Sequence, residues 1–322
     1  MKIALIRNSV NAVCVDGLNL AIRSAGHVSY ILAEDRELPD QKQIIGKELS
    51  YRRNSLQFSS EVHRWLLQNC PHVVEAPYSN YPLLLEQIAG GTPTVVRYDP
   101  EYSDIDFDQS LHDNWTRHTL ELSTVRAADV VVTSKESVAK QGKMICPMEV
   151  LPLGIQRPET LCRLYEDKPA TRSGFVLYCP DNYLSFYKEE MKTISVDAHS
   201  ISELESITDY SMFLGLKGVA VFSNKMCEQK ILSILSTGCP VIHSHIGSDY
   251  SYWPVMWVDA LSPESFKRLP SVLKLLDKRS KTSEECSQFA ENYYWPNLVD
   301  QYVTVYQAAV KQAWRTGRVR GW

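Results

Sequence analysis

The residues with the clearest chemical potential lie in the stretch CEQKILSILSTGCPVIHSH, which runs from Cys227 to His245. Apolar residues recur at helical spacing between Glu228 and Ser236, and a Gly-Cys-Pro break separates this predicted helix from a short β-branched strand. Lys230 falls in the first turn of the helix. Free backbone N–H groups and the positive end of the helix dipole favour an anion there, so the pattern predicts a phosphate site.

Carboxylates at two other predicted strands are candidates for work on a hydroxyl group. Asp99 follows the apolar run of the strand 92–98, and Glu75 lies in the strand 72–76. A carboxylate at the carboxyl end of a strand can orient or deprotonate a hydroxyl. Asp99 is therefore a candidate catalytic group, and Glu75 is a second carboxylate that could act on the same hydroxyl.

Two patterns contain residue types that can bind a metal ion. Asp104 and Asp106 form a DxD pair, and His243 and His245 point to one side of a predicted strand. The DxD pair follows a strand of an alternating βα pattern, where an acidic loop is the favoured interpretation, and the histidines lack further ligands at suitable spacing. We expect no metal site.

Composition narrows the classes of protein. The chain has 322 residues, of which 44% are hydrophobic and 22% charged, with a formal net charge of −4. This is a globular composition without the basic excess of a nucleic-acid binder. No run reaches the ~18 apolar residues of a membrane span, and the eight cysteines contain no CxxC pair, so we expect reduced thiols and a cytoplasmic protein.

The elements that must position these residues alternate between strand and helix. In the first half we predict strands at 2–6, 27–33, 72–76, 92–98, 129–134 and 148–153, and helices around 16–25, 55–68, 81–91, 112–127 and 135–144. Short β-branched strands alternating with helices are typical of a parallel sheet covered on both faces.

The rhythm breaks at 153–174, where two prolines, two glycines and mixed charges indicate a linker. It then restarts with strands at 174–179, 192–198, 218–223 and 239–244 and with helices at 202–210, 228–236, 262–276, 282–293 and 296–314. We therefore predict an α/β fold of two doubly wound, Rossmann-like domains facing a cleft. Open parallel sheets bind ligands beyond the carboxyl ends of their strands, so the cleft is the expected site.

Several motifs in order resemble the GT-B glycosyltransferases, especially family 4. They are AADVVVTSKES (127–137), VLPLGI (150–155), the segment 205–242 with its closing GCPVI, and ENYYWPNLVDQYVTVYQ (291–307). The resemblance implies a retaining, metal-independent enzyme that moves a sugar from a nucleotide-sugar to a hydroxyl of a glycan, a lipid-linked or a small-molecule acceptor. It implies residues 1–155 as the acceptor domain, with the helix 296–314 packing back on it, and 172–295 as an abbreviated donor domain.

The resemblance also distributes roles among the candidate residues. No cofactor is implied, because a UDP- or GDP-sugar serves as co-substrate. Lys230 would contact the diphosphate and stabilise charge on the leaving group. The candidate catalytic residues are Asp99 and Lys230; the candidate donor-binding residues are Lys188, Ser223, Glu228, Lys230, Ser233, Thr237 and Gly238; the acceptor-side candidates are Asp16, Gly17, Glu75 and Tyr98.

The chain departs from the family pattern at one position of the donor helix. Ser233 stands five residues before Gly238, where the family usually has a glutamate that binds ribose. A hydroxyl cannot make the bidentate contact of a carboxylate with a diol. Two alternatives therefore stay open: a catalytically silent homologue acting as a partner subunit, and a sugar-nucleotide epimerase of the same fold.

The C-terminal tail is the one segment with a membrane interpretation. Residues 311–322 carry four basic side chains and two tryptophans. A solvated helix end is the favoured interpretation, and weak peripheral contact with an anionic membrane is the alternative. No pattern in the sequence specifies an oligomeric state.

Overall fold

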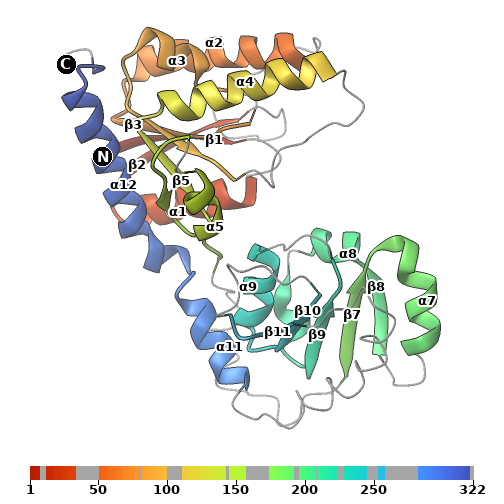
Figure 1. The fold of residues 1–322 in the computed structure, drawn as a ribbon. Coiled ribbons are helices and arrows are strands. Elements are labelled where there is room, and N and C mark those ends of the chain that lie inside the picture. The colour runs from red at the N-terminus through yellow and green to blue at the C-terminus, as the bar shows by residue number, and fades with distance from the viewer. Residues whose placement is uncertain are drawn as a thin grey trace. The chain divides into compact units, whose positions relative to one another are not determined.

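The chain forms two compact units, one of residues 1–152 with 298–322 and one of residues 153–297, hereafter unit 1 and unit 2. The computed structural model describes residues 1–7, 12–33, 51–79, 81–99, 111–142, 145–156, 174–191, 196–207, 209–223, 228–244, 253–257 and 282–319. Each unit is an α/β domain built on one parallel sheet, as the alternation of strand and helix predicts (Figure 1).

Unit 1 contains a six-stranded parallel sheet in the order β2-β1-β3-β4-β5-β6. Its strands are β1 (Lys2–Arg7), β2 (Val28–Ala33), β3 (Val73–Pro77), β4 (Thr94–Arg97), β5 (Val130–Thr133) and β6 (Glu149–Val150). Strands β1 to β5 are largely apolar because helices bury both faces of a parallel sheet, whereas both residues of the edge strand β6 are exposed.

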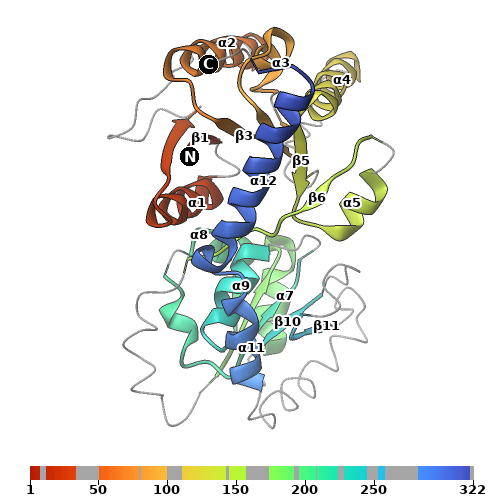
Figure 2. The same cartoon turned by 90° about the vertical axis from the view of Figure 1, so that its left-hand side faces the viewer.

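Helices cover the two faces of this sheet (Figures 1 and 2). They are α1 (Ala12–Ser24), α2 (Tyr51–Asn69), α3 (Leu84–Ala89), α4 (Leu111–Ala127), α5 (Glu136–Gly142) and α12 (Trp295–Arg315). Phe58 and Val62 of α2 and Val125 of α4 pack with Ala4 and Val74 in one core. Side chains alternate along a strand, so Leu5 and Glu75 point to the opposite face, which α1 and α12 cover.

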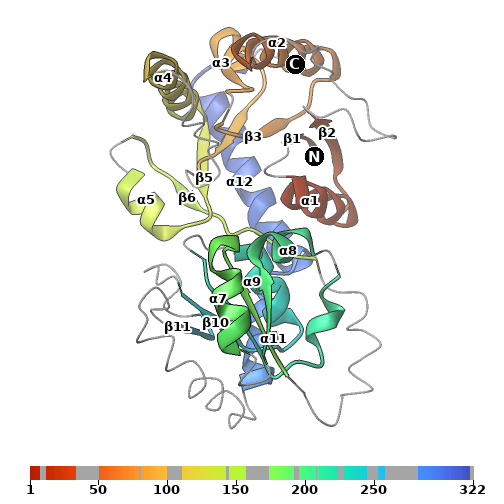
Figure 3. The same ribbon diagram turned by 90° about the vertical axis from the view of Figure 1, so that its right-hand side faces the viewer.

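Unit 2 contains a five-stranded parallel sheet in the order β11-β10-β9-β7-β8. The strands are β7 (Phe175–Cys179), β8 (Val196–Ser200), β9 (Gly218–Val221), β10 (Val241–His243) and β11 (Val255–Trp257). The helices are α7 (Asp181–Met191), α8 (Ile201–Ser206), the 3₁₀ helix η3 (Tyr210–Phe213), α9 (Glu228–Ser236) and α11 (Thr282–Glu291). Helices α9 and α11 pack together on one side of the sheet, and α7 lies on the other (Figures 1 and 3).

Some predicted boundaries shift in the structure. Helix α1 begins at Ala12, four residues earlier than predicted, so Asp16 and Gly17 lie in its second turn and not at its start. Between β7 and β8, where no helix is predicted, the structure has the eleven-residue helix α7, and β11 follows β10 as a strand that the sequence did not predict. The predicted helix 262–276 lies outside the described residues.

Candidate functional site

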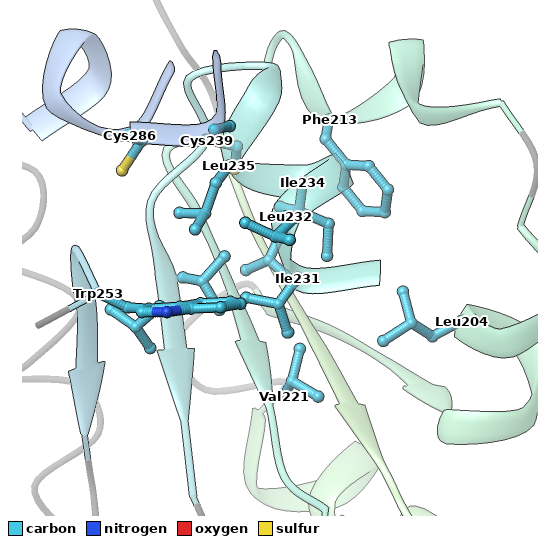
Figure 4. Packing of buried hydrophobic residues seen from close by; sticks show 14 of the residues in the cluster. Leu204, Phe213, Val221, Ile231, Leu232, Ile234, Leu235, Cys239, Trp253 and Cys286 are labelled. Atoms are coloured by element: carbon cyan, nitrogen blue, oxygen red, sulfur yellow. The ribbon is translucent and has the colours of Figure 1, made fainter. Parts of the chain in front are cut away.

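The helix that carries Lys230 forms where the sequence predicts it, from Glu228 to Ser236. Its apolar face is fully buried: Ile231 and Leu235 pack with Val221, Phe213 and Trp253 in the core of unit 2 (Figure 4). The four buried positions 231, 232, 234 and 235 repeat at helical spacing, so burial of this face fixes the rotation of the helix about its axis.

The end of α9 is equally well defined. Gly238 has φ 70°, a left-handed conformation that only glycine adopts without steric cost. The Thr237 hydroxyl donates to the Ile234 carbonyl at 2.7 Å, and the Ser283 hydroxyl of α11 donates to the Gly238 carbonyl. Thr237 and Gly238, two of the candidates for binding the sugar donor, therefore end the helix.

Lys230 is half-buried in the first turn of α9, and its ammonium has a specific environment. Nζ donates a 2.6 Å hydrogen bond to the carbonyl of Ile207 and lies 5.6 Å from the centre of the Tyr210 ring. Carbonyl and ring face both favour a positive charge. The structure thus holds the ammonium near the start of α9, against the segment that joins α8 to β9.

Strand β7 marks the topological switch point of this sheet. It pairs with β8 on one side and with β9 on the other, and ligands of open α/β sheets bind outside the carboxyl ends of such strands. Hydroxyls collect at these ends. The Ser200 hydroxyl bonds to the Asp181 carboxylate, and the Ser223 amide and carbonyl exchange hydrogen bonds of 2.9 and 3.1 Å with the Ser244 hydroxyl.

The remaining donor-side candidates occupy different depths. Glu228 is buried as the first residue of α9, whereas Ser233 is half-buried. Within the described ranges, the Ser233 hydroxyl makes no hydrogen bond. Lys188 is exposed and follows Asp181 by seven residues in α7, so at 1.5 Å per residue it lies about 10 Å along the helix from the carboxyl edge of the sheet.

In unit 1, the candidate Asp99 is buried, with 4% of its surface exposed. Its Oδ1 accepts hydrogen bonds from the Thr133 hydroxyl at 2.9 Å and from the amide and hydroxyl of Ser134 at 2.8 and 3.0 Å. Oδ2 lies 3.7 Å from Nη1 of Arg97. Asp99 therefore joins the end of β4 to the end of β5.

Glu75 belongs to a buried polar network with a residue that the sequence reading did not single out. Arg97 Nε donates to Glu75 Oε1 at 3.1 Å, and the Tyr306 hydroxyl of α12 donates to Oε2. Arg97 also donates to the Leu151 carbonyl and to the Tyr302 hydroxyl at 3.2 and 3.0 Å. Burial by itself would lower the pKa of Arg97, but Tyr302, Glu75 and Asp99 raise it above its ordinary value. Burial and Glu75 raise the pKa of Tyr306.

The other acceptor-side candidates are less enclosed. Asp16 is half-exposed and pairs with Arg7, whose Nε lies 3.3 Å from Oδ1. Gly17 is buried within α1. The Tyr98 ring packs on Tyr78 with centroids 4.8 Å apart, and burial, aided by Glu121, raises its pKa.

Arg97, Tyr302 and Tyr306 are the polar residues that the sequence reading missed. The available signal was an arginine at the end of an apolar strand, together with tyrosines at i and i+4 of a terminal helix. The sequence could not pair them because the Arg97–Tyr302 hydrogen bond spans 205 residues.

Several further predictions lie partly or wholly outside the described residues. These are Asp104, Asp106, His245, residues 157–173 of the predicted linker 153–174, and the last residues of the tail, 320–322. His243 is described and is fully buried at the end of β10. Among the described residues, no three His, Cys, Asp or Glu side chains come together as a metal site, and no helix is long and apolar enough to cross a membrane.

The comparisons with known proteins establish the fold. No family model matches the sequence, and no curated protein sequence does so either. Sucrose-phosphate synthase from Thermosynechococcus elongatus is similar in structure, with a TM-score of 0.65 and 13% identity over 95% of this chain and 98% of that chain. The glycotransferase of kitacinnamycin is also similar, with a TM-score of 0.58 and 11% identity over 95% of this chain and 98% of that chain.

UDP-GlcNAc 2-epimerase from Neisseria meningitidis, solved with UDP-GlcNAc bound, gives a TM-score of 0.61 and 11% identity over 95% of this chain and 99% of that chain. These likenesses span both units. The chain therefore has the GT-B fold of two Rossmann-like domains, shared by glycosyltransferases and UDP-GlcNAc 2-epimerases.

Proposed function

We propose that this protein is a glycosyltransferase that moves a sugar from a nucleotide-sugar, a UDP- or GDP-sugar in the first instance, to an acceptor hydroxyl. The observation that carries the proposal is the position of Lys230 in the first turn of α9, the helix that follows β9 in unit 2. Similar structures that cover nearly the whole chain include two sugar-metabolising synthases or transferases, and an epimerase bound to UDP-GlcNAc.

The reaction breaks the bond between the anomeric carbon and the diphosphate and forms a bond from that carbon to the acceptor oxygen. The nucleoside diphosphate leaves with the bonding electron pair, and the acceptor hydroxyl gives its proton to the Asp99 carboxylate. Lys230 and the N–H groups at the start of α9 supply positive potential for the leaving group. For this role, the Lys230 ammonium exchanges the Ile207 carbonyl for a phosphate oxygen.

Asp99 is the proposed acceptor-side carboxylate, since its Oδ2 accepts no hydrogen bond among the described residues. Glu75 and Tyr98 are the further acceptor candidates from β3 and from the end of β4, and Asp16 and Gly17 belong to the helix after β1. The donor is assigned to unit 2 and the acceptor to unit 1. Catalysis then consists of positioning and of charge stabilisation, without a protein-bound cofactor.

The test uses the whole chain with UDP-, GDP- and dTDP-sugars, and it measures thermal stabilisation and release of nucleoside diphosphate. Lys230→Ala should weaken donor binding by roughly tenfold or more, the size expected for a charge-assisted hydrogen bond. Lys217→Ala is the matched control, because Lys217 directly precedes β9 at the opposite edge of the same sheet. Full donor affinity in the Lys230 variant would remove the phosphate assignment.

A second candidate function is epimerisation of a sugar nucleotide. It is favoured by the several similar structures that are UDP-GlcNAc 2-epimerases, among them one from Methanocaldococcus jannaschii. The same incubation separates the two functions, since an epimerase converts the donor's sugar without needing an acceptor. Failure of every sugar nucleotide to bind would favour the silent partner-subunit alternative, which Ser233 motivates.

A further inference from the structure

Arg7 occupies a special position in the sheet of unit 1. It is the last residue of β1, and β1 pairs with β2 on one side and with β3 on the other. The chain thus continues from β1 to β2 at one flank and returns to β3 at the opposite flank, which makes the end of β1 the switch point of this sheet. Only 14% of the Arg7 side chain is exposed.

Among the described residues, the Arg7 guanidinium has Asp16 as its hydrogen-bond partner. A guanidinium has five N–H donors in a fixed fork. Nη2 donates one long hydrogen bond of 3.4 Å to Asp16 Oδ2, and Nε lies 3.3 Å from Asp16 Oδ1. In the part of the chain that the structure describes, the buried Nε makes no hydrogen bond. The N–H groups of a largely buried charge normally donate hydrogen bonds. We therefore expect a further hydrogen-bond acceptor at the Arg7 guanidinium.

Arg97 provides the comparison within the same sheet. It ends β4 as Arg7 ends β1, and both strands pair with the intervening β3. Each of its three guanidinium nitrogens donates a hydrogen bond: Nε to Glu75, Nη1 to the Leu151 carbonyl and Nη2 to the Tyr302 hydroxyl. Arg97 is thus a structural arginine, whereas the half-exposed carboxylate of Asp16 is the one partner of Arg7 within the described ranges.

We propose that Arg7 is an anion-binding residue of unit 1 that takes the phosphate or carboxylate group of a small ligand. Either group presents two oxygens that match the guanidinium fork. The first turn of α1 contains no acidic residue, so the dipole of this thirteen-residue helix adds positive potential to that of Arg7. Asp16, which is 45% exposed, holds the fork until the ligand arrives.

The proposed function indicates which molecule carries this anionic group. If unit 1 binds the acceptor, the acceptor bears a phosphate or a carboxylate, and Arg7 selects it over neutral sugars. This naming of the carrier rests on the proposed function. The anion site itself rests on Arg7 alone and is tested without any sugar nucleotide.

The experiment titrates the whole protein with inorganic phosphate and with acetate by calorimetry. Arg7→Gln should weaken phosphate binding by roughly tenfold or more, as expected for loss of charge-assisted hydrogen bonds, and Asp16→Asn should strengthen it by removing the competing carboxylate. Arg23→Gln is the matched control. Arg23 lies in the last turn of α1, at the other end of that helix from the proposed site, and donates a hydrogen bond to the Ser29 carbonyl. Equal affinity in Arg7→Gln and in the unchanged protein, or no binding by either anion, overturns the proposal.

Two additions keep the test decisive. Arg7→Lys retains the charge but loses the fork; if Arg7→Gln does not fold, reduced phosphate affinity in a folded Arg7→Lys supports the proposal and unchanged affinity overturns it. Phosphate binding that survives in Arg7→Gln and is lost in Lys230→Ala assigns the anion to unit 2 and also overturns it.

Competition with UDP identifies the carrier. Phosphate and UDP bound together point to an acceptor anion, and mutual exclusion that depends on Arg7 points to the donor diphosphate; both outcomes support an anion site at Arg7. Absence of nucleotide-sugar binding refutes the proposed function, while the phosphate titration still decides the role of Arg7.

Discussion

Arg97 Nη2 donates a 3.0 Å hydrogen bond to the hydroxyl of Tyr302, a residue that follows 205 positions later in the chain. The same tyrosine donates its own proton to the Pro152 carbonyl at 2.9 Å. Together with the Tyr306–Glu75 bond, these contacts attach α12 to the sheet of unit 1 through polar groups. The network explains why the last described residues of the chain belong to the same unit as its first strand.

Replacement of Arg97 by methionine should strongly destabilise unit 1. The change leaves the buried Glu75 and Asp99 carboxylates without their positive partner, and loss of one partner of a buried ion pair costs about 3–5 kcal/mol. Denaturant unfolding monitored by circular dichroism measures this loss. Gln307→Ala, on the exposed side of α12, should stay within about 0.5 kcal/mol of the unchanged protein.

Tyr306→Phe tests the same network more gently. Glu75 keeps Arg97 as a partner and loses one hydrogen bond, so the free energy of unfolding should fall by about 1–3 kcal/mol. A Tyr306→Phe protein as stable as the original would mean that Arg97 alone satisfies Glu75.

Gly154→Ala should destabilise unit 2. A Cβ at this position would overlap the Trp295 ring, and overpacking of a well-packed contact costs about 1–3 kcal/mol. Gly215→Ala is the control within the same unit, because a Cβ there meets nothing within 4 Å. Thermal unfolding of the two variants should show a lower midpoint for Gly154→Ala only, and equal midpoints would contradict the close approach of Trp295.

Unit 2 should lose stability in alkali through two neighbouring residues of β7. Burial raises the pKa of the Cys179 thiol from 9.0 to about 11 and that of the Tyr178 phenol from 10.0 to about 12. The folded state therefore holds these protons more tightly than the unfolded chain. Their contribution is complete below pH 9.0 and is lost as the pH rises to about 11 for Cys179 and about 12 for Tyr178.

Each group adds at most ~1.4 kcal/mol per pH unit to the slope of stability against pH. Cys179→Ser and Tyr178→Phe should each flatten that slope in denaturant titrations at a series of alkaline pH values. Cys70→Ser, at an exposed cysteine, should leave the slope unchanged. A slope that neither β7 variant alters would assign alkaline unfolding to other groups.

Ser233→Glu should strengthen the binding of nucleotide-sugars. In the resemblance to glycosyltransferase family 4, this position carries a ribose-binding glutamate, and Ser233 is half-buried on α9, two helical positions from the buried Ile231. A charged hydrogen bond to the diol should raise affinity by up to about tenfold. Ser233→Gln, of the same size but neutral, should gain less, and no gain in either variant would separate this helix from ribose recognition.

The sequence alone determined the fold class and the order of the elements. Hydrophobic periodicity is local, so α9 forms over the predicted residues 228–236, and the alternation of strand and helix predicts the two parallel sheets. The glycine that closes α9 was also readable, because its left-handed conformation depends on its own backbone. Boundaries shifted where the local signal was weak, as in α1, which begins four residues before the predicted helix.

Only the tertiary structure decided what the polar side chains contact. Asp99 and Glu75 could be placed on strands from sequence, but their partners Ser134, Arg97 and Tyr306 depend on which strands and helices become neighbours. Lys230 could be placed in the first turn of its helix, yet its contacts with Ile207 and Tyr210 arise from the packing of α9 against η3 and the segment after α8. The contrast between the three partners of the Arg97 guanidinium and the one partner of Arg7 within the described residues has the same origin: hydrogen bonds between distant residues exist only once the chain has folded.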